Sequence, residues 1–242
     1  YADNFSGVPM RASTLKALIL HSADDMGSPG PDYTYGWGMM NTKKAADIIR
    51  SHKGSPINNH MMEDALTTTE ASKTYTFAWN GLGPVRVTIC WTEPAGTAQL
   101  GLNTTTANLV NDLDLRVTGP GGTTMPYTLN PASPGTAATT GDNVRDNVEQ
   151  VYIDAPAAGT YTVTVNHKGT LTGVNGRQNF SLIHEGLRSD APVIRLSSKL
   201  LTFSTPPSSS PDFQSFTLQN TGVKPLNYSI TDNASWLHVN PT

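Results

Sequence analysis

The sequence has a single cysteine, few charged residues and no long apolar run, and each of these shortages excludes a class of protein. Cys90 cannot form a disulfide within the chain, and its place in the apolar stretch 87–91 predicts a small buried residue. No apolar run reaches the roughly 18–20 residues of a membrane-spanning helix, so we predict no membrane span. The chain has 16 Lys and Arg against 19 Asp and Glu, without a basic run or stripe. Nucleic acid is therefore not an expected partner.

Small polar residues and loop formers make up much of what is present. Thr, Ser, Asn, Gly and Pro are abundant, while charged residues amount to only 14%. This composition is typical of a secreted bacterial protein, and we expect an extracellular location. A chain of 242 residues has room for one large domain or two small ones. Tyr1 does not open a signal peptide, because neither a basic nor an apolar region follows it.

Residues 1–53 have the pattern of two helices rather than of strands. Thr14 or Ser13 is suited to cap a helix over residues 15–23, and Asn41 is suited to cap a second helix from Thr42 to about Ser51. The face of the first helix that we expect to be buried carries Leu15, Leu18, Ile19 and Ser22. Two helices of this length cannot bury enough surface to fold alone, so this segment belongs to a larger domain.

Residues 54–188 alternate between apolar and polar side chains, with turn residues between the alternating runs. We predict strands over 73–79, 85–91, 109–117, 148–154, 161–165 and 180–183. Short strands separated by turns indicate an antiparallel jelly-roll sandwich and a mainly β fold class. Tyr75, Trp79 and Trp91 are expected in its core, the alternative being an aromatic platform that binds sugar.

A third segment, residues 189–242, begins within a short polar stretch, residues 188–192, that ends in proline. Its predicted strands cover 194–197, 201–203, 213–219, 226–230 and 236–239. An immunoglobulin-like sandwich usually has about seven strands and about 100 residues, so we expect an incomplete module here. With the helical remnant at the other end, the chain reads as a fragment at both ends.

The most informative stretch is the predicted strand over residues 109–117. Leu113, Leu115 and Val117 fall on one face of it, while Asp112 and Asp114 project side by side from the other. Residues two apart on a strand are separated by roughly 6–7 Å. Two carboxylates at that distance repel each other unless a cation lies between them.

A second group of oxygen-bearing side chains follows in the stretch 142–149, where Asp142, Asp146 and Glu149 precede the strand that begins near residue 148. Six to eight hard oxygen ligands, drawn from a strand and a neighbouring loop, are what Ca²⁺ requires. We therefore predict a calcium site formed by Asp112, Asp114, Asp142, Asp146 and Glu149. The alternative is a solvated face on which Arg116 and Arg145 neutralise the acids.

Residues 1–53 resemble the end of a subtilisin-like serine protease domain. The matching residues are Leu15-Lys16-Ala17-Leu18-Ile19, Ala23-Asp24-Asp25, Gly30-Pro31-Asp32-Tyr33, Gly36-Trp37-Gly38 and Asn41 with Ala45-Ala46. Residues 54–188 resemble the C-terminal jelly roll of secreted bacterial subtilases, similar to the P domain of the kexin-like branch. That resemblance rests on Val87-Thr88-Ile89-Cys90-Trp91, Leu109 to Leu115, Asn147-Val148-Glu149, Ala155 to Tyr161 and Gln178 to Leu182.

The tail resembles Ig-like adhesion modules through the stretches 216–222 and 235–239. The resemblances together imply the non-catalytic C-terminal region of a secreted subtilisin-like serine endopeptidase. They imply two partners as well, an upstream protease domain of the same polypeptide and, for the intact enzyme, a protein substrate. The alternative is a carbohydrate- or surface-binding adhesion module without protease activity.

The sequence departs from the subtilase family in having no Gly-Thr-Ser-Met-Ala-x-Pro nucleophile motif. No residue of the Asp, His and Ser triad can be carried over, and this chain alone is not expected to hydrolyse a peptide. His21 lies near Asp24 and Asp25, a spacing that is typical of charges at a helix end rather than of an acid–base pair. The catalytic residues are expected upstream of Tyr1.

Overall fold

The computed structural model describes residues 9–54, 60–102, 104–185, 188–189, 194–198, 200–206, 208–220, 225–234 and 237–239. The chain divides into two compact units, Tyr1–Ser189 and Asp190–Thr242. None of the helices in the described ranges is long and apolar enough to span a membrane. The three segments proposed from the sequence, with boundaries at 53/54 and 188/189, stay a prediction about domain organisation.

The helices and strands follow one another along the chain in a mainly β order. They are α1 (Ala12–Ser22), α2 (Thr42–Gly54), β1 (Met61–Thr67), β2 (Ser72–Trp79), β3 (Val85–Trp91), β4 (Leu113–Gly119), β5 (Gly122–Thr124), β6 (Tyr127–Thr128), β7 (Thr139–Thr140), β8 (Val148–Ile153), β9 (Gly159–His167), the 3₁₀ turn η2 (Val174–Gly176), β10 (Arg177–Glu185), β11 (Arg188–Ser189), β12 (Ile194–Leu196) and β13 (Leu218–Asn220).

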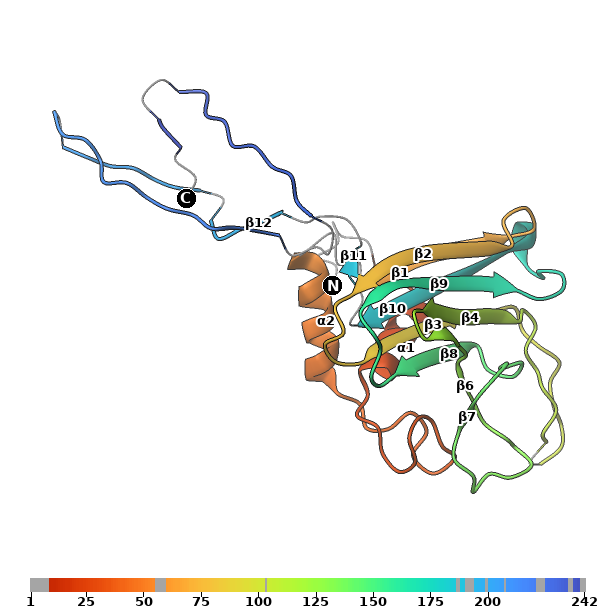
Figure 1. The fold of residues 1–242 in the computed structure, drawn as a ribbon. Coiled ribbons are helices and arrows are strands. Elements are labelled where there is room, and N and C mark those ends of the chain that lie inside the picture. The colour runs from red at the N-terminus through yellow and green to blue at the C-terminus, as the bar shows by residue number, and fades with distance from the viewer. Residues whose placement is uncertain are drawn as a thin grey trace. The chain divides into compact units, whose positions relative to one another are not determined.

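The first unit contains a jelly-roll sandwich of two antiparallel sheets (Figure 1). One sheet has the order β1-β10-β3-β8 and the other β11-β2-β9-β4-β5. Counting β1 to β5 and β8 to β10 as eight consecutive strands, the first sheet holds the first, eighth, third and sixth. The second sheet holds the second, seventh, fourth and fifth, which is the strand order of a jelly roll. The predicted mainly β fold class is confirmed.

Alternation along the strands places the core between the two sheets. Leu113, Leu115 and Val117 are fully buried on β4, as their spacing predicts. Trp79 and Trp91 are buried in the same core, and Tyr75 packs against it. These aromatic residues are therefore core residues and do not form a platform.

The strand predicted over 109–117 begins only at Leu113. The amide groups of Val110 and Asn111 donate instead to the Glu93 carboxylate, at 2.9 and 2.8 Å. These two amides are therefore paired with a side chain and not with a neighbouring strand, so pairing in the sheet starts only after Asn111. Trp91 Nε1 donates to the Asn111 carbonyl at 3.0 Å and holds the same segment against the core.

Helix α1 packs on strands β3 and β10 of the first sheet. The prediction that Ser13 or Thr14 caps it is wrong, because the helix begins at Ala12, with Arg11 as its N-cap residue, and both hydroxyls are buried against the sheet. The predicted buried face is also wrong in part, since Leu15 is 50% exposed. The sheet presents hydroxyl groups to this helix, so polar side chains take positions that periodicity assigns to apolar ones.

Helix α2 has the N-cap that the sequence predicts, because Asn41 Oδ1 accepts a hydrogen bond from the Lys44 amide at 2.9 Å. The apolar side chains of both helices share one core with the sheet. Its buried members are Ala17, Leu18, Ile48, Met61, Cys90, Val148 and Ile183. Cys90 is fully buried and free, as predicted.

Among the described residues of the second unit, β12 and β13 form one antiparallel pair. In its described residues, the segments 201–203 and 226–230 form no strand, so those two predicted strands are wrong. The strand predicted over 236–239 lies partly outside the described residues. An immunoglobulin-like module stays a prediction for this part of the chain.

Candidate functional site

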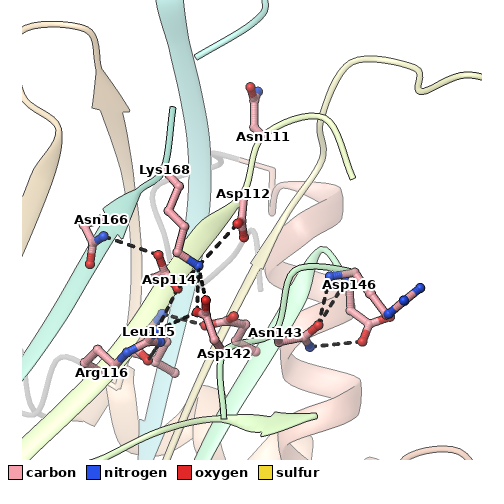
Figure 2. Close-up of polar contacts among 12 residues, drawn as sticks. Asn111, Asp112, Asp114, Leu115, Arg116, Asp142, Asn143, Asp146, Asn166 and Lys168 are labelled. Atoms are coloured by element: carbon pink, nitrogen blue, oxygen red, sulfur yellow. Dashed lines mark hydrogen bonds and ion pairs between the residues drawn. The ribbon is translucent and has the colours of Figure 1, made fainter. Parts of the chain in front are cut away.

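Three acidic side chains meet at the start of β4, where this strand pairs with the end of β9 (Figure 2). Asp114 is the second residue of β4, Asp112 directly precedes that strand, and Asp142 comes from the loop between β7 and β8. Lys168 directly follows β9, and its amide donates to the Asp112 carbonyl at 2.9 Å. The antiparallel register, with Asp114 opposite Asn166, brings Lys168 to the acids.

The Lys168 ammonium lies among all three carboxylates. Its Nζ is 2.6 Å from both Asp142 oxygens, 3.0 Å from Asp114 Oδ1 and 3.4 Å from Asp112 Oδ2. Asn166 Nδ2 adds a longer contact of 3.4 Å to Asp114 Oδ2. Asp114 is the most buried of the three acids, with only 2% of its surface exposed. A single primary amine therefore serves as the common counter-ion of the cluster.

Arg116 is the second cation at this site. Its NH2 group is 2.9 Å from Asp114 Oδ1 and 2.7 Å from Asp142 Oδ1, while NH1 donates to the Leu115 carbonyl at 2.8 Å. The other arginine named from the sequence, Arg145, instead donates to the Thr105 carbonyl. Arg116 and Lys168 together thus supply two positive charges to three carboxylates.

The remaining two predicted ligands are placed differently. Asp146 accepts a hydrogen bond of 3.0 Å from Asn143 Nδ2 within its own loop. Glu149 is fully buried on β8, and its Oε2 accepts a hydrogen bond from the Leu115 amide at 2.6 Å. The structure thus gathers three of the five predicted ligands around Lys168 and leaves the other two in separate roles.

Burial and charge set the protonation of the acids. Hydrogen bonding to Lys168, followed by Asp114 and Arg116, lowers the pKa of Asp142 to about 2. Burial, together with the neighbouring Asp142, raises the pKa of Asp114. Burial also raises the pKa of Glu149 to about 9, more than its hydrogen bond from Leu115 lowers it. Burial thus favours the protonated form of Glu149.

As arranged here, the cluster does not fit a divalent metal. Lys168 Nζ takes the position among the carboxylates that a cation would need, and the described residues include no group of three or more His, Cys, Asp or Glu side chains placed to hold a metal. Asp112 Oδ1 and Glu149 Oε1 are buried without a hydrogen-bond partner. The calcium site stays a prediction.

Lys168 was missed in the sequence because nothing marks it locally. It lies 54 residues after Asp114, and only the pairing of β4 with β9 brings the two together. The sequence does show that Lys168 follows a strongly alternating strand and stands near the polar residue Asn166, which marks the end of a strand but not its partner. Register between distant strands cannot be read from that pattern.

A second polar cluster joins α1 to the first sheet. The hydroxyls of Ser13 and Thr14 each lie 2.8 Å from the hydroxyl of Ser181 on β10, and Thr14 also donates to Glu63 on β1. Arg11 Nε is 3.1 Å from Glu63 Oε2. The start of α1 is thereby tied to two strands by buried or half-buried polar groups.

The end of α1 is held in the same way through His21, which is fully buried. Its Nδ1 lies 2.9 Å from Thr88 Oγ1 on β3, and its Nε2 lies 3.5 Å from Glu185 Oε2 on β10. Arg86 donates to the His21 carbonyl at 2.7 Å. His21 therefore does lie in the last turn of the helix, but its acidic partner is on the sheet rather than at Asp24 or Asp25.

Comparisons with known proteins give no family. No family model matches the chain, and no curated protein matches it. The solved structures that resemble it include the pre-peptidase C-terminal domain of a collagenase from Bacillus anthracis, at 11% identity over 52% of this chain and 87% of that one, with a TM-score of 0.30.

Two further solved structures resemble about half of the chain. The Bacillus licheniformis lipase BlEst2 in propeptide form is 17% identical over 54% of this chain and 22% of that one, with a TM-score of 0.26. PliG of Aeromonas hydrophila, a periplasmic inhibitor of g-type lysozyme, is 13% identical over 53% of this chain and 84% of that one, with a TM-score of 0.23. These similarities are too weak to indicate a function.

Proposed function

We propose that this chain is the non-catalytic C-terminal region of a secreted bacterial subtilisin-like serine endopeptidase, in which the jelly roll stabilises the protease domain. The observation that carries the proposal is the packing of α1 on β3 and β10, in the sheet of β1, β10, β3 and β8. Helix α1 belongs to the segment that resembles the end of a protease domain. Anything that holds this helix in place would support the domain to which it belongs.

The apolar part of this union has a substantial magnitude. Leu18 is 2% exposed and Ala17 is fully buried, and both pack in the core that contains Cys90 and Ile183. Burying one leucine side chain stabilises a fold by about 1.5–3 kcal/mol. Separating α1 from the sheet would return this surface to water.

The polar part makes separation still more costly. The hydroxyls of Ser13, Thr14 and Ser181 satisfy one another, and an unpaired buried hydroxyl costs about 1–3 kcal/mol. The sandwich is thus suited to act as a fixed support, and the helix as its attachment.

In the intact enzyme, an activated serine upstream of this chain would attack a peptide carbonyl of a protein substrate, with a histidine as general base. The residues described here supply no part of that chemistry under the proposal. They act by keeping the last helices of the protease domain in their folded positions.

The alternative, an adhesion module, gains no support from the described residues. The three aromatic side chains that suggested a platform belong to the core. Trp37, Tyr127 and Tyr152 line an open cavity of about 140 Å³. Ligand pockets usually have about 300–1,000 Å³, so this cavity is too small to enclose a sugar ligand. A second cavity of about 330 Å³ reaches that size, but its lining residues are Lys44, Asp47, Pro84, Arg86 and Glu185, with no aromatic side chain among them.

The test is fluorophosphonate labelling of the natural polypeptide that contains this chain, recovered from the culture medium of its producer with an antibody against the jelly roll. This chain, produced alone, is labelled in parallel, with a known subtilase as the positive control. We expect label on a longer natural polypeptide and none on this chain. A natural polypeptide that takes up no label, while the control does, would contradict the proposal.

A further inference from the structure

The acidic cluster at the start of β4 has a charge balance that includes no metal. Asp112, Asp114 and Asp142 carry three negative charges when ionised, and Arg116 and Lys168 carry two positive ones. A single negative charge remains, and Asp112 and Asp142 are open enough to solvent for water to screen it.

We propose that Lys168 is the resident cation of this cluster, in the place that the sequence assigns to calcium, so that the jelly roll is fastened here without a metal. The amine makes contacts with all three carboxylates, the shortest being 2.6 Å to Asp142. An ammonium group has three donors and no acceptor, which suits a site built only of carboxylate oxygens.

Lys168 joins three segments that are distant in the sequence. Its backbone amide binds the Asp112 carbonyl, and its side chain binds the acids on β4 and the loop that carries Asp142. Arg116 reaches the same loop from β4. The loop before β8 is thereby fixed to the β4–β9 pair. Calcium would perform the same cross-linking with oxygen ligands, but the lysine supplies it at any calcium concentration.

Removing this lysine leaves the cluster with an excess of two negative charges, which a divalent cation would neutralise. Without Lys168 the three carboxylates and Arg116 carry a net charge of −2, and the space among the carboxylates is vacated. The matched change is Lys168→Met, which keeps much of the apolar stem and removes the ammonium. The control is Lys43→Met, because Lys43 pairs with Asp47 on the exposed face of α2 and its side chain is 85% exposed.

The experiment is thermal unfolding of the full chain, followed by circular dichroism, in EDTA and in about 5 mM calcium chloride at equal ionic strength. This concentration exceeds the dissociation constants of about 10⁻⁴–10⁻³ M typical of extracellular calcium modules. For the unaltered protein we expect the same Tm in both solutions. For Lys168→Met we expect a Tm lower by on the order of 3 °C in EDTA, with at least half of the loss restored by calcium. Lys43→Met should behave as the unaltered protein does.

Two results would overturn the proposal. One is a Tm of the unaltered protein that rises in calcium and falls in EDTA, because the site would then hold a metal beside the lysine. The other is a Lys168→Met variant as stable as the unaltered protein in EDTA. Should that variant fail to fold, equilibrium dialysis of the unaltered protein against ⁴⁵Ca²⁺ decides. Binding of one calcium per chain, lost in Asp114→Asn, would refute the proposal, and no binding would support it.

Discussion

Glu149 offers a quantitative prediction, because it is fully buried on β8 and its carboxyl has a pKa raised to about 9 by burial. The ordinary pKa of a glutamate, 4.5, applies in the unfolded chain. A folded pKa above the unfolded one means that the unfolded state releases its proton first as the pH rises. The contribution of Glu149 to stability is therefore fully present below pH 4.5 and is lost progressively between pH 4.5 and about pH 9.

The perturbation is Glu149→Gln, which imitates the neutral acid and cannot titrate. Each pH unit inside the window costs about 1.36 kcal/mol, so the unaltered protein loses roughly 3 kcal/mol through this group between about pH 5 and pH 7. The side-chain oxygen of the introduced glutamine can still accept the hydrogen bond from the Leu115 amide. We expect the variant to be nearly equal in stability at pH 5 and about 3 kcal/mol more stable at pH 7.

The assay is urea unfolding of both proteins across this pH range, with the free energy of unfolding extrapolated to water. Titrations that both proteins share cancel in the difference between them. Glu70→Gln is the control, because that side chain is 55% exposed and bound to Lys73 on the surface. Parallel pH profiles for the unaltered protein and Glu149→Gln would refute the reasoning, since they would show that Glu149 is ionised in the fold.

Two further predictions concern buried groups. Burial lowers the pKa of His21 below 6.5, more than the nearby Glu185 raises it, so the stability it contributes is present above pH 6.5 and lost as the pH falls toward its folded pKa. Guanidinium unfolding should show a steeper loss from about pH 7 to pH 5 in the unaltered protein than in His21→Gln, and equal slopes would contradict this. Cys90 is fully buried, and burial raises the pKa of its thiol to about 11, so we expect a disulfide reagent at pH 8 to react only after unfolding. Rapid reaction of the folded protein would show that this face of the sheet opens.

Most of the sandwich was predictable because many of its strands have one face toward water and the other toward the core, which makes polar and apolar residues alternate. The strand over 159–167 alternates in this way, and a glycine begins it. The strand over 85–91 is buried on both faces, because helix α1 covers the face that points away from the other sheet. Strand β1 was not predicted. Its buried residues, Met61, Ala65 and Leu66, do not alternate along the sequence MMEDALT. The reason is that helix α1 covers part of the sheet that β1 borders, so residues on both faces of the strand are buried.

The candidate site was predictable only in part. The spacing of Asp112 and Asp114 places them on one face of the chain, and that much follows from the period of a strand. The position of Lys168 depends on which strand pairs with β4 and in what register, information that only the folded chain contains. The raised pKa of Glu149 likewise depends on its burial in the folded chain, and its sequence neighbours do not reveal it.

The central claim is that the jelly roll supports the protease domain through α1. The most direct test is the heat resistance of fluorophosphonate labelling in the natural polypeptide, compared between the unaltered protein, Thr14→Val and the surface control Lys43→Met. Thr14→Val keeps the shape of the side chain but removes its hydrogen bonds to Ser181 and Glu63, at a cost of about 0.5–1.5 kcal/mol for each bond, since both groups keep another partner. The account predicts that Thr14→Val loses its labelling at a lower temperature than the other two proteins. The account would be contradicted if labelling in all three proteins were equally resistant to heat while the jelly roll unfolded at a lower Tm in Thr14→Val than in the other two.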